Sequence, residues 1–292
     1  MPKTIRWFLL SALSLIFLTQ ITACQTTPPA ILRLATTTST EDSGLLDTIL
    51  PLFEQEYNAR VDVIAVGTGQ ALTLGQNGDA DLILVHARDR EDQFVAEGYG
   101  LSRHDVMYND FVIIGPANDP ANIRSAPDLS TAFQRIATTQ STFISRGDDS
   151  GTHIREQTLW QQADITPADG WYLAIGQGMG ATLTIADEQQ AYTLTDRGTF
   201  IKRQTIGLTL PILYQNDPAL VNPYGIIPIN PQRHAVNSQL AQQFITWLTS
   251  PPIQQQIDNY TINGQQLFYS NSQGACPPAC FRHAPPNNTS HS

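Results

Sequence analysis

The chain has 292 residues, of which 41% are hydrophobic and 14% are charged. This length allows one or two domains with a sizeable core, and the composition excludes both a disordered chain and a protein with many membrane spans. The formal net charge of −10 excludes a general nucleic-acid binder, which needs a basic surface, but it leaves room for a small oxyanion held by local donors.

The N-terminus has the layout of an export signal. Two basic residues and no acid precede an apolar run over residues 7–18, which is too short for a transmembrane helix. The segment ends in Ile21-Thr22-Ala23-Cys24, which resembles the bacterial lipobox, where cleavage before the cysteine leaves it to be acylated. An ordinary signal peptide with an incidental cysteine is the alternative. We expect residues 1–23 to be removed as a signal peptide, and Cys24 to anchor a periplasmic protein to the membrane.

From residue 31 onward the chain alternates strands and helices. Apolar β-branched runs predict the strands, and apolar residues at helical spacing predict the helices between them. The first part contains strands at 31–36, 61–66 and 81–86, and helices at 43–57, 68–76 and 90–97. This strand–helix order predicts a parallel sheet covered by helices.

The second part begins with an extended run at 106–115 and repeats the alternation. We expect helices at 129–138, 150–162, 181–190, 195–201, 236–248 and 251–260, and strands at 171–175, 191–194, 208–214 and 224–229. The pattern predicts two α/β lobes, the second inserted into the first, with two crossing segments and a ligand cleft between the lobes. The expected lobe 1 comprises residues 24–113 and 210–270, and the expected lobe 2 comprises residues 114–209.

Residues 271–292 are rich in Gly, Pro, Asn and Ser and show almost no periodicity, so we expect a flexible tail. Two of the three cysteines, Cys276 and Cys280, lie in this tail, and outside the cytoplasm we expect a disulfide between them. A metal site would need further ligands besides the two cysteines, and only His283 and His291 are available in this segment. We therefore expect no bound metal cation.

Two turns in the first part are candidate binding segments, and each joins a strand to a helix. The turn at 36–44 reads TTTSTEDSG and places five hydroxyls in succession at a strand end. Capping of the helix explains one or two of them, so the others are candidate donors to a ligand. The turn at 66–70 combines a hydroxyl with glycines, which allow close approach of the backbone. The candidate residues are Thr37, Thr38, Ser39, Gly67, Thr68, Gly69 and Gln70.

A third turn, at 145–153, reads SRGDDSGTH and opens a helix. It offers a guanidinium, several hydroxyls and the free N–H groups of a helix start, which together suit a tetrahedral oxyanion. Arg146 supplies the only fixed positive charge in the three turns. A solvent loop with a capping Asp or Ser is the alternative. The candidate residues are Ser145, Arg146, Ser150, Gly151 and Thr152.

Two other chemistries fit poorly. Ser150, His153 and Asp148 could form a hydrolase triad, but there is no G-x-S-x-G turn, and a triad is recognised by its geometry. Residues 176–181 fit G-x-G-x-x-A with Asp196 about 20 residues on, as in a dinucleotide site, yet an exported protein is not supplied with nicotinamide cofactors. We therefore expect neither enzyme activity nor a cofactor.

Seven motifs resemble, in order, those of the tungstate-binding proteins of ABC importers. They are TTTST at 36–40, VGTG at 66–69, LVHAR at 84–88, VMYNDF at 106–111, SRGDDSGT at 145–152, GMG at 178–180 and YTLTDRGT at 192–199. The resemblance implies the two-lobed periplasmic binding protein fold, of type II-like topology, in a monomer that delivers tungstate to a membrane permease. It also implies donors at Thr37, Thr38 and Ser39, in the turn Gly67–Gln70, and at Arg146, Ser150 and Thr152.

The pattern leaves the choice of oxyanion open. Tungstate at neutral pH is an unprotonated dianion and needs donors only, whereas hydrogen phosphate also benefits from an acceptor. Asp148 or Asp149 could be that acceptor or could orient Arg146 from behind, so phosphate is the main alternative, and molybdate is too similar to tungstate to be distinguished. Because arginine and hydroxyl groups do not titrate near neutrality, we expect the affinity for a dianion to be nearly flat from about pH 6 to 8.

Overall fold

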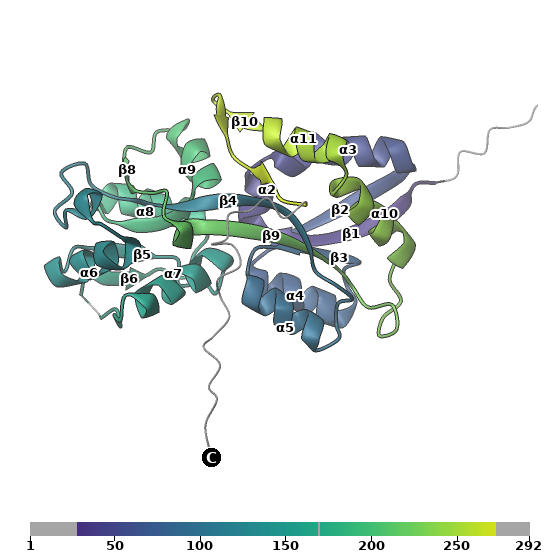
Figure 1. Ribbon diagram of the computed structural model, residues 1–292, viewed down its shortest axis with the longest axis horizontal. Coiled ribbons are helices and arrows are strands. Elements are labelled where there is room, and N and C mark those ends of the chain that lie inside the picture. Colours follow the sequence, from purple (N-terminus) through teal and green to yellow (C-terminus); the bar gives the residue numbers. More distant parts are fainter. Residues whose placement is uncertain (1–27, 169, 273–292) are drawn as a thin grey trace, which may run out of the picture.

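The computed structural model describes residues 28–168 and 170–272 of the chain. The predicted signal peptide, Cys24 and the pair Cys276 and Cys280 lie outside these ranges. Two lobes follow each other along the long axis of the molecule, and strands β4 (His104–Ile114) and β9 (Val221–Pro228) run side by side from one lobe toward the other (Figure 1). No helix in the described ranges is long and apolar enough to cross a membrane.

Lobe 1 is built on a mixed sheet with the strand order β12-β4-β9-β3-β1-β2. Strands β1 (Ala30–Thr37), β2 (Ala59–Val66) and β3 (Leu82–Val85) run parallel, which confirms the prediction for this part of the chain. Strand β9 is antiparallel to β3, β4 to β9, and β12 (Tyr269–Ser270) to β4. The sheet is mixed because β9 returns from lobe 2 in the reverse direction, which requires no crossover helix.

Helices cover both faces of this sheet. Leu32 and Leu34 of β1 join the large hydrophobic cluster on one face, whereas Ala35 joins a smaller cluster on the other, since successive side chains of a strand point to opposite faces. The large cluster includes residues of α3 (Leu45–Tyr57), α10 (Ser238–Leu248) and α11 (Pro251–Asn259), and the smaller one includes residues of α4 (Thr68–Asn77) and α5 (Arg88–Ala96).

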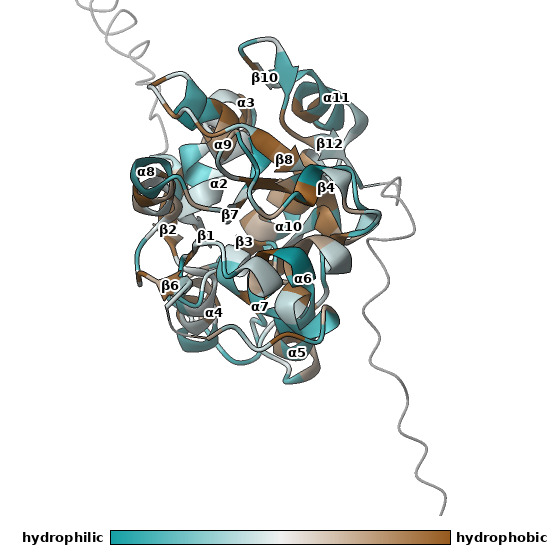
Figure 2. Ribbon diagram, turned by 90° about the vertical axis from the view of Figure 1, so that its left-hand side faces the viewer, coloured by the Kyte–Doolittle hydropathy of each residue, from teal (hydrophilic) through white to brown (hydrophobic). Residues whose placement is uncertain are grey.

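Lobe 2 likewise has strands between two layers of helices, and in Figure 2 the hydrophobic strands β4 and β8 lie between more polar helices. The second half of β4 pairs with β7 (Thr193–Asp196) and β8 (Ile212–Tyr214), while β5 (Phe143–Ser145) pairs with β6 (Tyr172–Ala174). Phe111 and Ile113 of β4 pack in one cluster with α6 (Leu129–Thr139) and α7 (Gly151–Gln162). Val112 and Ile114 share the other cluster with α8 (Met179–Gln189) and α9 (Arg197–Gln204).

The helices and longer strands lie where the sequence predicts them, with ends that differ by a few residues. Several short elements were not predicted. They are β5 and β12, the helix α2 (Thr38–Asp42), the 3-10 turns η1 (Ile123–Ser125) and η2 (Pro218–Leu220), and the hairpin of β10 (Thr261–Ile262) and β11 (Gln265–Gln266).

The partners of β4 indicate where the chain passes between the lobes. It pairs with β9 through Asp110 and with β7 from Phe111 onward, so the first crossing lies between these residues. We place the second boundary at residue 221 rather than at 210, because β8 pairs with the lobe-2 half of β4, and Leu213 and Leu220 pack in the lobe-2 cluster. Lobe 1 is defined here as residues 28–110 and 221–272, and lobe 2 as residues 111–168 and 170–220.

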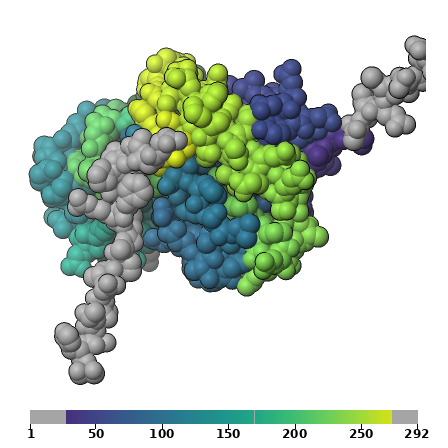
Figure 3. All heavy atoms as spheres, turned by 45° about the vertical axis from the view of Figure 1, so that its right-hand side comes forward, coloured from purple at the N-terminus to yellow at the C-terminus, as the bar shows by residue number. Residues whose placement is uncertain are grey.

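The described chain begins and ends in lobe 1, where its first residues (purple) and last residues (yellow) both lie in Figure 3. The segment predicted as a flexible tail starts inside this lobe. Asn271 is buried, and its N–H donates to the carbonyl of Val106 at 3.0 Å. The N–H of Ser272 donates to the side chain of Gln254 at 3.1 Å, so we count residues 271 and 272 with lobe 1.

Candidate functional site

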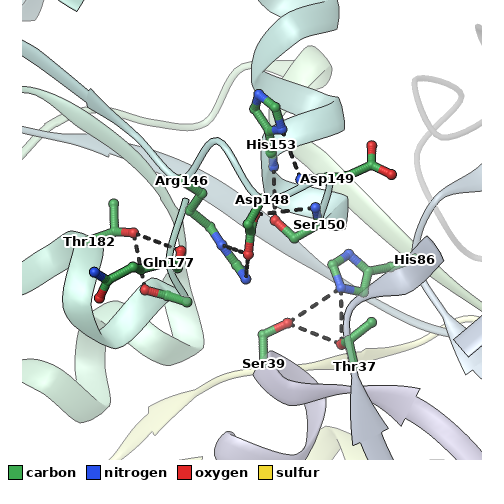
Figure 4. Close-up of polar contacts among 11 residues, drawn as sticks. Thr37, Ser39, His86, Arg146, Asp148, Asp149, Ser150, His153, Gln177 and Thr182 are labelled. Carbon is green, nitrogen blue, oxygen red and sulfur yellow. Dashed lines mark hydrogen bonds and ion pairs between the residues drawn. The ribbon is translucent and has the colours of Figure 1, made fainter. Parts of the chain in front are cut away.

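The predicted binding turns meet between the lobes. The Thr37–Ser39 turn follows β1, the Gly67–Gln70 turn follows β2, and the Arg146–Gly151 turn follows β5. Carboxyl ends of strands are where open α/β sheets bind ligands, and here two such ends belong to lobe 1 and one to lobe 2. Figure 4 shows the first and third turns facing each other, with His86 between them.

The hydroxyl-rich turn after β1 folds into the short helix α2. Thr37 caps it, because its Oγ1 accepts the N–H of Thr40 at 3.2 Å. The same Oγ1 lies 2.7 Å from Thr40 Oγ1 and 3.1 Å from Ser39 Oγ. Thr38 is exposed, whereas Thr37, Ser39 and Thr40 are buried. The sequence prediction of a plain turn before residue 43 missed this helix, which concentrates the hydroxyls on the side of His86.

His86 follows β3 and was not predicted as a site residue. Its Nε2 lies 3.3 Å from Thr37 Oγ1 and 3.5 Å from Ser39 Oγ, and its Nδ1 lies 3.1 Å from Asn222 Oδ1. Burial lowers the pKa of His86 to about 4. The hydrogen bond with Asn222 raises this pKa, whereas the charge of Arg146 lowers it further. The ring is therefore neutral at neutral pH, and with Nδ1–H donated to Asn222, Nε2 accepts from the hydroxyls.

The hydrogen bonds of His86 continue into the crossing strands. Asn222 Nδ2 donates to Asn109 Oδ1 at 2.7 Å, and these two residues lie opposite each other on β9 and β4. Tyr224 of β9 stacks on the His86 ring with a centroid separation of 4.6 Å. No local pattern could have predicted these contacts, because each of them joins two residues that are more than a hundred positions apart in the sequence.

Arg146 is buried, and Asp148 orients it from behind. Its Nε and Nη2 donate to Asp148 Oδ2 at 3.2 and 2.5 Å, while Asp148 Oδ1 accepts the N–H of Ser150 at 3.2 Å. Burial opposes ionisation of Asp148, but the hydrogen bonds with Ser150 and Arg146 and the arginine charge outweigh it and lower the pKa. Nη1 of Arg146 donates to no residue in the described ranges, so one edge of the guanidinium is available to a ligand.

The start of α7 does not have the geometry of a hydrolase triad. Ser150 caps the helix by accepting the backbone N–H of His153 at 3.3 Å. The ring of His153 is turned elsewhere, because its Nδ1 accepts the N–H of Asp149 at 3.1 Å. The Ser–His ring hydrogen bond that the triad needs is absent between these two described residues.

Two buried hydroxyls flank the site from opposite lobes. Thr68 is the first residue of α4 in lobe 1, and Thr152 lies in the first turn of α7 in lobe 2. Each is at most 1% exposed, and neither Oγ1 has a hydrogen-bond partner among the described residues. A buried polar atom without a partner costs about 1–3 kcal/mol, so such atoms are rare unless a ligand or water completes them. Both hydroxyls therefore suit donation to a small anion.

The two lobes are in contact around this site. A Cβ added to Gly151 of lobe 2 would lie 2.8 Å from His86 Cε1 and 3.3 Å from Thr68 Oγ1, both in lobe 1. A neighbouring cavity is lined from both sides, by His86 and Asn222 of lobe 1 and by Gly151 and Thr158 of lobe 2. The arrangement is therefore that of a closed cleft, and Gly151 allows the approach because it has no side chain.

Asp149 connects the lobes, whereas the sequence analysis offered it, as an alternative to Asp148, as an acceptor for the ligand or as the residue that orients Arg146. Its carboxylate pairs with Arg90 of α5 at 2.8 Å across the lobe boundary. Gly69 leaves room for this pair, since a Cβ there would lie 3.3 Å from Asp149 Oδ2 and 3.4 Å from Arg90 Nη1. Gln70, the last residue of the predicted turn, is exposed.

The pair of Arg90 and Asp149 gives a prediction about closure. Because Arg90 is 35% and Asp149 68% exposed, the pair contributes at most about 1 kcal/mol to closure, and salt screens it. Asp149→Asn is therefore expected to weaken ligand binding by no more than about fivefold, and to remove part of the salt dependence of the affinity. Titrations at low and high salt with Asp149→Asn, Arg90→Gln and the double variant check this. Additive effects of the two changes would contradict a direct pair.

A buried acid of α7, Glu156, gives a prediction about stability. Its Oε1 accepts hydrogen bonds from Tyr172 at 2.8 Å and Trp160 at 3.2 Å, and burial raises its pKa to about 7. The folded state therefore binds this proton more tightly than the unfolded chain. The protonated Glu156 makes its full contribution to the free energy of unfolding below about pH 4.5. As the pH rises toward 7, about 3 kcal/mol of this contribution is lost. Denaturant unfolding at several pH values is expected to show a shallower decline for Glu156→Gln; an unchanged slope would contradict the assignment.

Within residues 28–168 and 170–272 no group of three or more His, Cys, Asp or Glu side chains is placed to hold a metal ion. The groups that meet at this lobe boundary are instead donors, namely Arg146, hydroxyls of both lobes and the starts of α4 and α7. Donors without acidic ligands suit an anion.

Comparison with known proteins agrees with this geometry. A family model described as the PBP superfamily domain matches residues 24–252. The fold and the cleft thus define a substrate-binding protein of the periplasmic binding protein superfamily. The tungstate-binding protein TupA of Peptoclostridium acidaminophilum is 48% identical over 244 residues, which cover 82% of this chain and 85% of the relative. The chain belongs to the family of the tungstate-binding proteins of ABC transporters.

Two solved structures support the same assignment. The tungstate ABC transporter structure from Geobacter sulfurreducens is 52% identical with a TM-score of 0.74, covering 79% of this chain and 98% of that one. The tungstate-binding protein TupA from Desulfovibrio alaskensis G20 is 43% identical with a TM-score of 0.73, covering 83% of this chain and 99% of that one. These likenesses extend over both lobes.

Proposed function

We propose that this protein captures tungstate in the cleft between its lobes and delivers it to an ABC permease. The observation that carries the proposal is the pair of buried hydroxyls of Thr68 and Thr152, which come from opposite lobes and have no hydrogen-bond partner among the described residues. A small tetrahedral dianion can accept from both hydroxyls and from Arg146 when the lobes close. The names of the relatives support tungstate as this dianion.

The full set of proposed ligand residues remains the one read from the sequence. It comprises Thr37, Thr38, Ser39, Gly67, Thr68, Gly69, Gln70, Ser145, Arg146, Ser150, Gly151 and Thr152. Arg146, Thr68 and Thr152 have the strongest structural support, whereas the exposed Thr38 and Gln70 have the least. Each hydrogen bond to a charged ligand contributes about 1.5–3 kcal/mol, so five or six of them outweigh the repulsion of an acidic protein that is screened beyond roughly 8 Å.

We also propose that the protein works in the periplasm, anchored through an acylated Cys24 after removal of residues 1–23. The lipobox-like sequence Ile21-Thr22-Ala23-Cys24 supports this. Fractionation of cells that express the wild type and Cys24→Ser tests it. The wild type is expected in the membrane fraction and the variant in the soluble periplasm; a wild type found only in the soluble fraction would refute the anchor.

Calorimetric titration with tungstate, molybdate, phosphate and sulfate in parallel tests the proposed ligand. We expect tight binding of tungstate and much weaker binding of phosphate, because Asp148 is ionised and occupied by Arg146 and Ser150. It is therefore not free to accept a hydrogen bond from the P–OH group of hydrogen phosphate. Tight binding of phosphate with no binding of tungstate would make the protein a phosphate receptor instead.

A further inference from the structure

The buried ring of His86 touches the proposed ligand residues but has no part in the proposed ligand set. Its Nε2 lies 3.3 Å from Thr37 Oγ1 and 3.5 Å from Ser39 Oγ. At the next ring atom, Cε1, a Cβ added to Gly151 of lobe 2 would lie only 2.8 Å away. The ring therefore lies between the hydroxyls of α2 and the start of α7, as Figure 4 shows.

A chain of amide groups determines which ring nitrogen carries the hydrogen. Asn222 Nδ2 donates to Asn109 Oδ1 at 2.7 Å, and Asn109 Nδ2 donates to the hydroxyl of Tyr224 at 3.4 Å. Asn222 therefore presents its Oδ1 to His86 Nδ1, at 3.1 Å, and a carbonyl oxygen can only accept. The hydrogen of the neutral ring is on Nδ1, and Nε2 is the acceptor.

The groups that fix the ring come from the two strands that connect the lobes. Asn109 of β4 and Asn222 of β9 lie opposite each other, next to the positions where these strands leave lobe 1. Tyr224 of β9 stacks on the ring, and all three side chains are buried. A ring turned over about its Cβ–Cγ bond would place a C–H group against Asn222 Oδ1 and leave this buried oxygen without its donor, so the ring is held in one orientation.

The ring is neutral as well as fixed. Its nitrogens face an amide and hydroxyls, and neither nitrogen has an acidic partner among the described residues. Burial lowers the pKa of His86 to about 4, and the charge of Arg146 lowers it further. The other titratable or charged side chains around the ring are Tyr224, which stays protonated, and the cavity residues Arg88, Asp89, Arg90 and Arg155.

A neutral Nε2 accepts one hydrogen, whereas two hydroxyls lie within its reach. The hydroxyl oxygens of Thr37 and Ser39 are also 3.1 Å apart, so without a fixed acceptor each of them could donate to the other. When one hydroxyl donates to Nε2, the second one keeps its hydrogen for a ligand. Donors that are oriented before the anion arrives lose less freedom on binding than hydroxyls that rotate freely.

We infer that His86 is a positioning residue of the oxyanion site: as a fixed acceptor it takes the hydrogen of one hydroxyl, that of Thr37 or Ser39, and leaves the other to donate to the bound dianion. This inference rests on the proposed function. Through the ring, it makes the amide pair of Asn109 and Asn222 part of the site. It also gives a role to the motifs LVHAR at 84–88 and VMYNDF at 106–111, which contribute no residue to the proposed ligand set.

Calorimetric titration of the purified protein with sodium tungstate tests the need for this acceptor. His86→Leu removes the acceptor and is expected to weaken binding by at least about tenfold. His86→Gln is expected to bind within about threefold of the wild type, because a glutamine amide offers one acceptor and one donor, as the neutral ring does. Melting temperatures without ligand show that the variants are folded. A His86→Gln variant that is folded and binds as weakly as His86→Leu would contradict a neutral acceptor.

A double-variant cycle with Ser39→Ala shows whether His86 acts through the hydroxyls. If Ser39 donates to the anion, its loss leaves His86 with nothing to position. If Ser39 instead donates to Nε2, its loss makes Nε2 compete with the anion for the Thr37 hydrogen. In both cases we expect His86→Leu to cost at least about threefold less affinity in the Ser39→Ala protein than in the wild type. Additive losses would overturn the inference, because His86 would then act independently of the hydroxyls.

Nitrogen-15 NMR of protein labelled at histidine reads the state of the ring without a change at His86 itself. We expect one tautomer with its hydrogen on Nδ1, both before and after saturation with tungstate. Asn222→Ala removes the group that fixes the ring, so the hydrogen is expected to distribute over both nitrogens and the affinity to fall by about threefold or more. A wild-type ring that carries its hydrogen on Nε2, or that becomes an imidazolium when tungstate binds, would overturn the inference.

His104 offers a matched control. Its Nε2 also lies near a hydroxyl, 2.9 Å from Ser102 Oγ, but it is the first residue of β4, at the opposite end of the lobe-1 half of this strand from the crossing. His104→Leu is expected to bind tungstate as the wild type does, and an equal loss in both leucine variants would refute a specific role of His86. All of these contrary results leave the proposed function intact, whereas a wild type that binds no tungstate would contradict that function itself.

Discussion

Replacement of Arg146 by alanine is expected to weaken tungstate binding by about 2 kcal/mol or more, which is at least about 30-fold. The arginine is buried, it is the cation among the proposed ligand residues, and one edge of its guanidinium donates to no residue in the described ranges. Its removal also leaves the Asp148 carboxylate without its partner beside an anion. Calorimetric titration of the wild type and the variant measures the loss.

Two further variants separate the causes of that loss. Arg146→Lys keeps the charge but not the planar fork, so it is expected to recover only part of the affinity. Arg146→Ala combined with Asp148→Asn removes the unpaired carboxylate, so it is expected to bind better than Arg146→Ala alone. An unchanged affinity of Arg146→Ala would remove this residue from the site.

Replacement of Gly151 by alanine is expected to hinder closure of the cleft without unfolding either lobe. Gly151 is the first residue of α7 and has an ordinary negative φ, so alanine suits the helix and is expected to leave stability equal or raise it by about 0.5–1 kcal/mol. Its methyl group, however, would lie 2.8 Å from His86 Cε1 in the opposite lobe. We expect affinity to fall by about tenfold or more, because the lobes cannot reach their closed contact.

Small-angle scattering and thermal unfolding together test this expectation. The wild type is expected to become more compact with saturating tungstate, and Gly151→Ala much less so, at an equal or higher melting temperature. Gly180→Ala is a suitable control, because Gly180 also lies in the first turn of a lobe-2 helix but its added Cβ would meet no atom within 4 Å. Normal compaction of Gly151→Ala would contradict the steric argument.

Much of the fold could be predicted because its signals are local. The helix α10 has its apolar residues Leu240, Phe244, Ile245 and Leu248 at helical spacing, and all four are buried in the structure. The strand β3 reads as a continuous apolar run because the sheet is covered on both faces. The direction of β9 could not be predicted in this way, because it depends on how the chain returns from lobe 2. No local sequence pattern indicates that return.

The site was predictable in part for the same reason. Hydroxyl- and glycine-rich turns at the carboxyl ends of strands are visible in the sequence, and the structure brings three of them together. Contacts between the lobes are not visible, because Arg90 and Asp149, or His86 and Gly151, become neighbours only through the relative placement of the two lobes.

The contact of Gly151 with His86 and Thr68 has a consequence for the rate at which the anion leaves. While the lobes touch there, the start of α7 lies directly against the lobe-1 side of the site, so release must wait for the lobes to part. The residence time of the ligand is then limited by the opening rate, which depends on the lobe contacts as well as on the hydrogen bonds of the ligand to both lobes. Residues at the lobe contacts, such as Arg90 and Asp149, can therefore change how long the anion is held while touching neither the anion nor its chemical selectivity.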